Sequence, residues 1–391
     1  MFREPTRRNG FSKMLPFVLV VDVGATTSRF ALARKDGSLE AVRSIDNREA
    51  ADLAAVLGAA LESCAPLRPL SCVLAVAAPV DGDEVRLTNR AWSFSQRELC
   101  AALHLKRLTV VNDFAAIAHA LPELRHADLV AFGGGRGVAG ATMLVCGPGT
   151  GFGAATLQQH GGPPRAVPSE AGHMRLGAAT ADEARVLAHL VREDGPVAIE
   201  HVLSGPGLVR LHRILAGEET TSEAIVATAR LGRNAARDTV HAFLRLFGRV
   251  AGDLALAFDA RGGVFIAGGI GRVLAPFYAA SPFREAFDEH PPQQARLGSN
   301  AARDTVHAFL RLFGRVAGDL ALAFDARGGV FIAGGIGRVL APFYASSPFR
   351  EAFDEHPPYQ ARLAAIPVCV IAHAAPGLLG AARIAASLAR D

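Results

Sequence analysis

The sequence has few of the features that stabilise secreted, metal-bound or membrane-spanning domains. Its 391 residues include five cysteines, an odd number with no CxxC pair, which argues against a disulfide framework or a structural zinc site and favours a reducing cytosol. The longest apolar candidate, 364–382, is interrupted by Pro367, His373 and Pro376. We therefore expect no membrane-spanning helix.

Lysine is also scarce, since it occurs only at positions 13, 35 and 106. A Walker-type phosphate loop, which depends on a lysine, is therefore excluded. The net charge of +4 comes from residues 1–13, which contribute +3, and residues 234–299, which contribute +1. A neutral body with a basic tail is not typical of nucleic-acid-binding proteins. We expect a disordered basic tail over 1–15 and no nucleic-acid partner.

What the sequence does contain is a long internal repeat. Residues 234–297 (copy one) and 300–363 (copy two) are the same sequence, except for Ala280/Ser346 and Gln293/Tyr359. A solenoid has several diverged units, so two nearly identical copies indicate a recent tandem duplication instead. The chain then corresponds to a protein of about 325 residues that carries one extra copy of 66 residues.

The remaining chain alternates between apolar strands and amphipathic helices. One hairpin is expected early in each half of the chain, around the turns at 24–27 and 147–151, and strands then alternate with helices. Each copy reads as helix, strand, helix, over 235–258, 263–270 and 273–290 for copy one. This order indicates an α/β fold with mixed sheets.

Two glycine turns follow strands and are candidates for phosphate binding. In Asp22-Val-Gly-Ala-Thr-Thr, the backbone of Gly24 and Ala25 and the Thr26 hydroxyl can approach a phosphate, with Asp22 facing Mg²⁺ through water. The second turn contains Gly147, Gly149, Thr150 and Gly151. For each turn, an ordinary structural hairpin is the alternative interpretation.

Polar side chains between elements are candidates for catalysis and sugar binding. Asp113 follows Asn112 at a strand end, so it is either the cap of the next helix or a general base. Glu170 and His173 lie in a glycine-containing loop that suits sugar hydroxyls, or they form an ordinary surface pair. Glu200 on a short helix is either a solvated side chain or part of the same site.

The order of these motifs resembles that of bacterial glucokinases. The resemblance is carried by AAPVDGD (77–83), LTNRAWSFS (87–95), NDF (112–114), GPGTGFG (147–153), SEAGH (169–173), IEHVLSGPG (199–207) and the repeated GGVFIAGGIG. It extends over about residues 16–390, with one copy excluded. It implies a two-domain actin-like, ribonuclease H-like sugar kinase with a cleft between domains: a small domain of 16–111 plus 373–391 and a large domain of 112–372.

The resemblance implies ATP- and Mg²⁺-dependent phosphorylation of glucose to glucose 6-phosphate, the first step of glycolysis, in a cytoplasmic enzyme that is usually a homodimer. It places Asp113 as the base, and Asn112, Glu170, His173 and Glu200 at the sugar. The two glycine turns fall on its phosphate turns. Its adenosine side falls on Gly334 and Gly335 or, in copy one, on Gly268 and Gly269.

The first turn departs from the usual GGTN of the resembled family, because Ala25 replaces a glycine and Thr27 an asparagine. Ala25 requires a backbone without a positive φ. The alternative to an active kinase is a catalytically impaired, sugar-binding regulatory protein or the product of a damaged gene. The fold has one position for the repeated unit, and we expect copy two to occupy it, with copy one inserted after helix 221–231. The sequence does not distinguish ATP from polyphosphate as the donor.

Overall fold

The computed structural model describes residues 17–34, 36–88, 90–132, 135–160, 162–289, 302–333 and 340–371. The predicted basic tail, the C-terminal part of the small domain (373–391), Gly334 and Gly335 lie outside these ranges. The chain divides into two compact units, 1–124 and 125–391, and the predicted domain boundaries stay predictions. In the described part of the chain, no helix is both long and apolar enough to span a membrane.

The first unit is built on a five-stranded mixed sheet of order β3-β2-β1-β4-β7. β1, β2 and β3 form antiparallel hairpins, whereas β4 and β7 continue the sheet in parallel from β1. The apolar residues of β1 and β4 meet those of α1 in one core, with Leu19, Leu57 and Leu74 fully buried. The elements are β1 (Val18–Val23), β2 (Thr27–Ala33), β3 (Leu39–Asp46), α1 (Leu53–Ser63), β4 (Ser71–Val76), β5 (Glu84–Arg86), β6 (Ser93–Ser95), α2 (Gln96–Ala102), β7 (Arg107–Asn112) and α3 (Asp113–Ala120).

The second unit begins with the same strand pattern. Its sheet has the order β10-β9-β8-β11, with an antiparallel β8–β9–β10 meander and β11 parallel to β8. Helices then pack around α8, whose N-terminus is capped by the Asn234 side chain. The elements up to this point are β8 (Met143–Pro148), β9 (Phe152–Gln158), β10 (Arg165–Ser169), α4 (Ala181–Asp194), α5 (Ile199–Val202), α6 (Gly205–Ala216), α7 (Ser222–Ala229), α8 (Ala235–Ala257), β11 (Gly263–Ile266), α9 (Gly269–Val273) and α10 (Phe283–Asp288).

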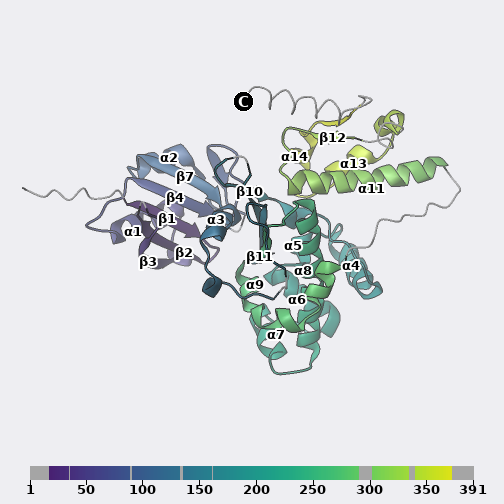
Figure 1. The fold of residues 1–391 in the computed structure, drawn as a ribbon, viewed down its shortest axis with the longest axis horizontal. Coiled ribbons are helices and arrows are strands. Elements are labelled where there is room, and N and C mark those ends of the chain that lie inside the picture. The colour runs from purple at the N-terminus through teal and green to yellow at the C-terminus, as the bar shows by residue number, and fades with distance from the viewer. Residues whose placement is uncertain are drawn as a thin grey trace, which may run out of the picture. The chain divides into compact units, whose positions relative to one another are not determined.

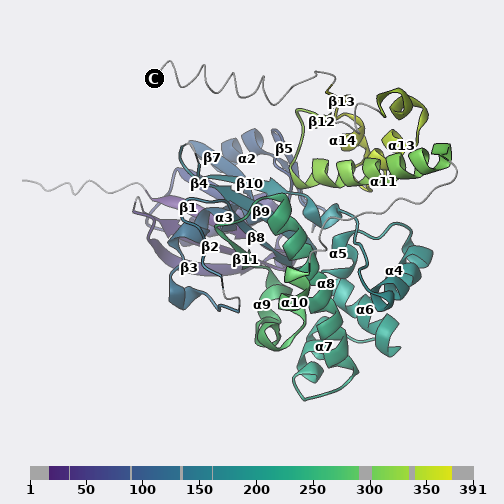
Figure 2. The same cartoon turned by 45° about the vertical axis from the view of Figure 1, so that its right-hand side comes forward.

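Copy one, and not copy two, occupies the position beside β8. Its strand β11 pairs with β8 from Gly263↔Met143 to Ile266↔Cys146, and its helix α8 packs against α6, α7 and α10 (Figures 1 and 2). The expectation that copy two docks there is therefore wrong. The sequence pattern of the two copies is the same, so their local preferences did not distinguish them.

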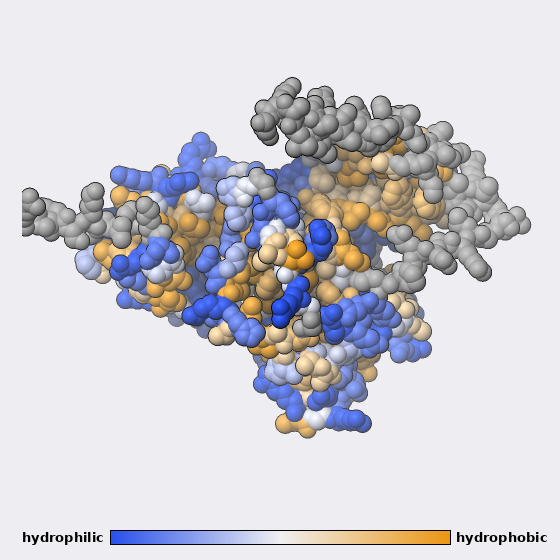
Figure 3. Space-filling view, in the orientation of Figure 1, coloured by the Kyte–Doolittle hydropathy of each residue, from blue (hydrophilic) through white to orange (hydrophobic). Residues whose placement is uncertain are grey.

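Copy two folds as a separate layer with its own small core. Its strand β12 pairs in parallel with β13, outside the main sheet, and its core includes Leu310, Phe349 and Phe353. Its long helix α11 carries exposed apolar side chains, and in Figure 3 hydrophobic surface is visible in the area that α11 occupies in Figure 1. The elements are α11 (Ala302–Ala323), β12 (Val330–Ile332), α13 (Phe349–Asp354), α14 (Gln360–Ala364) and β13 (Val368–Val370).

The packing inside each copy is the same. A Cβ on Gly248 of α8 would lie 2.1 Å from the Phe283 carbonyl oxygen, and a Cβ on Gly314 of α11 would lie 2.2 Å from that of Phe349. Both glycines therefore allow the long helix to approach the short helix closely. The copies differ in what the strand and the opposite face of the long helix meet outside the copy.

Candidate functional site

The first glycine turn joins β1 to β2 and is held by a side chain that sequence reasoning missed. The buried Asn47 donates from Nδ2 to the Gly24 carbonyl at 2.7 Å, its own N–H donates to the Thr26 carbonyl at 2.8 Å, and it accepts from the Ser28 hydroxyl at 2.8 Å. A buried amide with this many partners fixes the turn. The signal in the sequence was an Asn directly after β3, a residue type that is common in ordinary turns.

Gly24 and Ala25 of this turn differ in whether the backbone tolerates a side chain. A Cβ on Gly24 would lie 2.6 Å from the Thr27 carbonyl oxygen, so close approach requires glycine. Ala25 is not one of the described non-glycine residues that have a positive φ. The prediction that its backbone avoids a positive φ is therefore confirmed. Its carbonyl accepts from the Arg90 guanidinium at 3.0 Å. Asp22 is exposed at the carboxyl end of β1, one residue before the end of the strand.

Asp113 is the first residue of α3, and Asn112 rather than Asp113 is the helix cap. The Asn112 side chain accepts from the Ala115 N–H at 3.1 Å, and its Nδ2 donates to the Ala78 carbonyl at 3.4 Å. Asp113 accepts from the Phe114 N–H through Oδ1 at 2.9 Å. The residue that caps α3 through its side chain is therefore Asn112 and not Asp113.

The second glycine turn joins β8 to β9 and packs against two other segments of its unit. A Cβ on Gly147 would lie 2.0 Å from the Ala267 carbonyl oxygen, and the N–H of Gly205, the first residue of α6, donates to the Gly149 carbonyl at 2.9 Å. Gly268 has a φ of 86°, and a Cβ on it would lie 2.4 Å from the Pro148 carbonyl oxygen. Only glycine suits this position. The glycines of copy one therefore lie against the second candidate phosphate turn.

Three of the predicted sugar-binding residues lie together in the second unit. His173 Nδ1 lies 3.5 Å from Glu200 Oε1, and His173 Nε2 lies 4.0 Å from Glu170 Oε2. A Cβ on Gly151 would lie 2.7 Å from Glu200 Oε2, so this cluster adjoins the second glycine turn. The side chains of Glu170 and His173 are 20% and 15% exposed, so both are more buried than an ordinary surface pair would be.

Burial tunes the charges of this cluster. It raises the pKa of Glu170 and of Glu200 above the ordinary glutamate value, and it lowers the pKa of His173, an effect that the Glu170 charge opposes. A neutral imidazole between two carboxylates donates through one nitrogen and accepts through the other. The cluster therefore offers both acceptors and a donor, as recognition of several hydroxyl groups requires.

Copy two supplies a further residue to this cluster. Tyr359 donates from its hydroxyl to Glu170 Oε2 at 3.0 Å, and its ring meets the ring of His173 edge to face at 4.7 Å. Sequence reasoning noted Tyr359 only as a difference between the copies. Its separation of 189 residues from Glu170 left no local signal of the contact.

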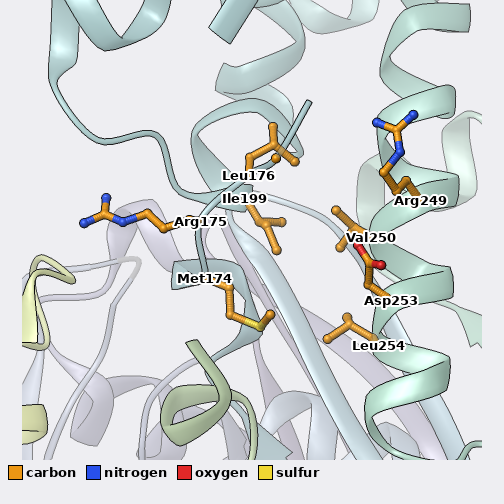
Figure 4. A pocket seen from close by; sticks show the side chains of 9 residues that line it. Met174, Arg175, Leu176, Ile199, Arg249, Val250, Asp253 and Leu254 are labelled. Atoms are coloured by element: carbon orange, nitrogen blue, oxygen red, sulfur yellow. The ribbon is translucent and has the colours of Figure 1, made fainter. Parts of the chain in front are cut away.

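A small cavity lies close in sequence to His173, between the chain at 174–177 and the helix α8 (Figure 4). Its volume is about 60 Å³, and it is lined by Met174, Ile199, Asp253 and Leu254 among others. This volume is enough for a few water molecules but not for a hexose. In the described ranges, no group of three or more His, Cys, Asp or Glu side chains could hold a metal ion.

The comparisons with known proteins agree with these motifs. The sequence profile of the glucokinase family matches residues 19–299 and again residues 293–388. The chain is 39% identical to a glucokinase of Tolumonas auensis over 280 residues, which are 70% of this chain and 87% of that protein. It is 38% identical to a glucokinase of Paramagnetospirillum magneticum over 317 residues, which are 78% of this chain and 98% of that protein.

A solved structure supports the same assignment. The glucokinase of an Antarctic psychrotroph is 27% identical to this chain, with a TM-score of 0.58, and the match covers 94% of this chain and 97% of that one. The strand order of both sheets and the places of the glycine turns agree with the predicted actin-like sugar kinase fold. The chain belongs to the glucokinase family.

Proposed function

We propose that this chain transfers the γ-phosphoryl group of ATP to the 6-hydroxyl of glucose, with Asp113 as the general base. The observation that carries the proposal is the cluster of Glu170, His173 and Glu200 beside the second glycine turn, in a chain of this family. Glucose presents several hydroxyl groups that need acceptors and donors in fixed positions. This cluster is built from such groups, and burial strengthens their hydrogen bonds.

In the proposed mechanism, the Asp113 carboxylate takes the proton of the sugar 6-hydroxyl as its oxygen attacks the γ-phosphorus in line. Asn112, Glu170, His173 and Glu200 hold the sugar. The backbone N–H groups of the two glycine turns neutralise phosphate charge. A sugar that lacks a matched hydroxyl leaves a buried carboxylate unpaired, which costs about 1–3 kcal/mol and sets selectivity.

Mg²⁺ would be bound with the nucleotide, where it neutralises the charge of the phosphates. Asp22 is the carboxylate of the first turn, and in the proposal it faces the ion through a water. One carboxylate with waters and phosphate oxygens is a typical Mg²⁺ environment. The residues present therefore fit the ion. Gly268 and Gly269 of copy one, rather than Gly334 and Gly335, are proposed for the adenosine side because they lie against the second turn.

The proposal extends to the setting of the enzyme. We place it in the cytoplasm at the first step of glycolysis, as a homodimer, and attribute the repeat to a tandem duplication. All five cysteines are free, which supports a reducing compartment. Light scattering of the purified chain tests the dimer.

A coupled assay of ADP release from the purified chain with ATP, Mg²⁺ and glucose tests the activity. We expect ADP release that depends on glucose, and the same assay without sugar is the control. Polyphosphate in place of ATP tests the donor. Glucose-independent ADP release, or no release with either donor, would overturn the proposal.

A further inference from the structure

Tyr359 lies at one of the two positions where the copies differ, and it contacts both the candidate sugar site and copy two itself. Copy one has Gln293 at this position. The Tyr359 hydroxyl donates to Glu170 Oε2 at 3.0 Å, and its ring covers His173 edge to face at 4.7 Å. A glutamine side chain has no aromatic ring, so it cannot reproduce the contact with His173.

Several further contacts attach copy two to the segment that carries Glu170 and His173. The Arg175 N–H donates to Asp319 Oδ1 of α11 at 2.9 Å, and the Glu170 N–H donates to the Leu322 carbonyl at 3.4 Å. The Arg175 guanidinium donates to the Glu355 carbonyl, and Figure 4 shows this side chain directed away from Arg249 and Asp253 of α8. The approach of Tyr359 to the site is therefore part of an extended interface.

Asp319 itself is fixed from the side of copy two. The buried His356 lies with Nε2 2.9 Å from Asp319 Oδ1, the same oxygen that accepts from Arg175. A carboxylate with two directional partners adopts one orientation. This arrangement links α11 to the turn after α13, which leads directly into Tyr359.

The Tyr359 ring also lies close to a cation of copy two. The Arg362 guanidinium lies 5.7 Å from the ring centre and is paired with Asp325, two residues after the end of α11. Burial and the negative charge of Glu170 raise the pKa of the Tyr359 hydroxyl. The hydroxyl therefore stays protonated at neutral pH and serves as a donor to Glu170.

We propose that Tyr359 is a positioning residue of the sugar site, which fixes the Glu170 carboxylate so that its remaining lone pairs face the hydroxyls of an aldohexose. The inference rests on the proposed function and deepens it. In this proposal the two copies have different roles. Copy one supplies the strand and glycines beside the second glycine turn, and copy two supplies the hydroxyl and ring of Tyr359 at the sugar site.

The test compares glucose binding by calorimetry, which needs no turnover, with KM and kcat from the coupled assay. In Tyr359→Phe the ring stays and only the donor is lost. We expect about a tenfold weaker glucose affinity and a matching rise in KM, equivalent to about 1.4 kcal/mol, with kcat nearly unchanged. Tyr359→Gln, which introduces the residue of copy one, removes the ring as well and should weaken binding further.

Two more variants make the test specific. Tyr344→Phe is the matched control, because Tyr344 is the other tyrosine of copy two and its hydroxyl has no hydrogen-bond partner in the described structure. It should leave glucose affinity unchanged. Gln293→Tyr in the Tyr359→Gln background asks whether copy one reaches the same site, and we expect it not to restore binding.

Three outcomes would overturn the inference. They are an unchanged affinity in Tyr359→Phe, a tighter affinity, which would mean that Tyr359 occupies the place of the sugar, and full restoration by Gln293→Tyr. Glucose affinity is also measured against pH. If its fall at low pH moves to a different pH in Tyr359→Phe, positioning is supported, because a role of Tyr359 in folding alone would not change the titration of Glu170. If the wild-type chain binds glucose but releases no ADP, the proposed function fails while the inference about Tyr359 is still decided by calorimetry.

Discussion

Leu246 and Leu312 occupy the same place in two identical stretches of sequence, yet Leu246 is 3% exposed and Leu312 is 59% exposed. Leu246 belongs to the core that α8 shares with α6 and α7. The chain contains a single α6–α7 pair, so only one copy can bury this face against it. The difference in exposure therefore records which copy is docked.

We predict that the same substitution in the two copies has very different effects on stability. Leu246→Ala should lower the free energy of unfolding by about 2–5 kcal/mol, the usual cost of a cavity in a core. Leu312→Ala should change it by no more than about 0.5 kcal/mol, as is typical of exposed sites. Urea unfolding of the two variants measures both values.

Equal losses in the two variants would mean that the copies exchange places in solution. A larger loss for Leu312→Ala would restore the sequence-based expectation that copy two docks. Because each variant is the control for the other, the comparison does not depend on the absolute stability of the chain.

The proposed base gives a second prediction. Asp113→Asn should lower kcat by at least about 10²–10⁴, the usual contribution of a general base, while glucose affinity changes little. An asparagine oxygen still accepts from the Phe114 N–H, which lies 2.9 Å from Asp113 Oδ1, so α3 should begin in the same way. The coupled assay and calorimetry measure the two effects, and near-normal turnover in this variant would exclude Asp113 as the base.

The raised pKa values of Glu170 and Glu200 predict an unusual pH dependence of sugar binding. Burial favours the protonated form of both carboxyls, and a protonated carboxyl loses acceptor capacity. For Glu170, the charges of His173 and Arg362 and the Tyr359 hydroxyl limit the rise, and the charge of Asp325 adds to it. Glucose affinity should therefore fall on acidification at pH values above the ordinary glutamate pKa of 4.5.

Calorimetric titrations with glucose between about pH 5 and pH 8, the range in which histidine also titrates, would measure this dependence. Glu200→Gln is the control, because it removes one of the two titrating carboxyls and should flatten the acid limb while it weakens binding overall. A glucose affinity that shows no fall over the whole of this pH range would contradict the prediction.

The sequence predicted local features of this structure, but it did not predict contacts between residues that are far apart in the chain. The two early hairpins and the strand end at Asn112 follow from apolar periodicity and glycine turns, which act over a few residues. The capping alternative for Asp113 is wrong, since Asn112 caps α3; the sequence did not separate the two neighbours because Asn and Asp both cap helices well. The docked copy and the Tyr359–Glu170 contact depend on tertiary packing, for which identical sequences give identical local preferences.

The two sheets suggest how the chain would fold with a single copy. The first sheet adds β4 and then β7 in parallel beside its three-stranded meander, whereas the second adds only β11, and β13 pairs with β12 instead. Since β11 and β12 have the same sequence around GVFI, deletion of one copy should unite the strand beside β8 with β13. The second sheet would then have five strands like the first.

We therefore predict that deletion of 234–299 and deletion of 300–365, each a loss of 66 residues, both give folded and active chains. Each deletion leaves one long helix where the full chain has two, so the exposed apolar face that the second long helix carries is lost. Both chains should therefore aggregate less than the full chain in light scattering. The two chains differ mainly in whether this tyrosine is present. The first retains Tyr359 and should have the lower KM for glucose, whereas the second has a glutamine, Gln293, at the corresponding position of the sequence. If the chain without 300–365 binds glucose as tightly as the chain without 234–299, a tyrosine at this position is not needed; if neither chain folds, the two copies support each other and are not alternatives for one place.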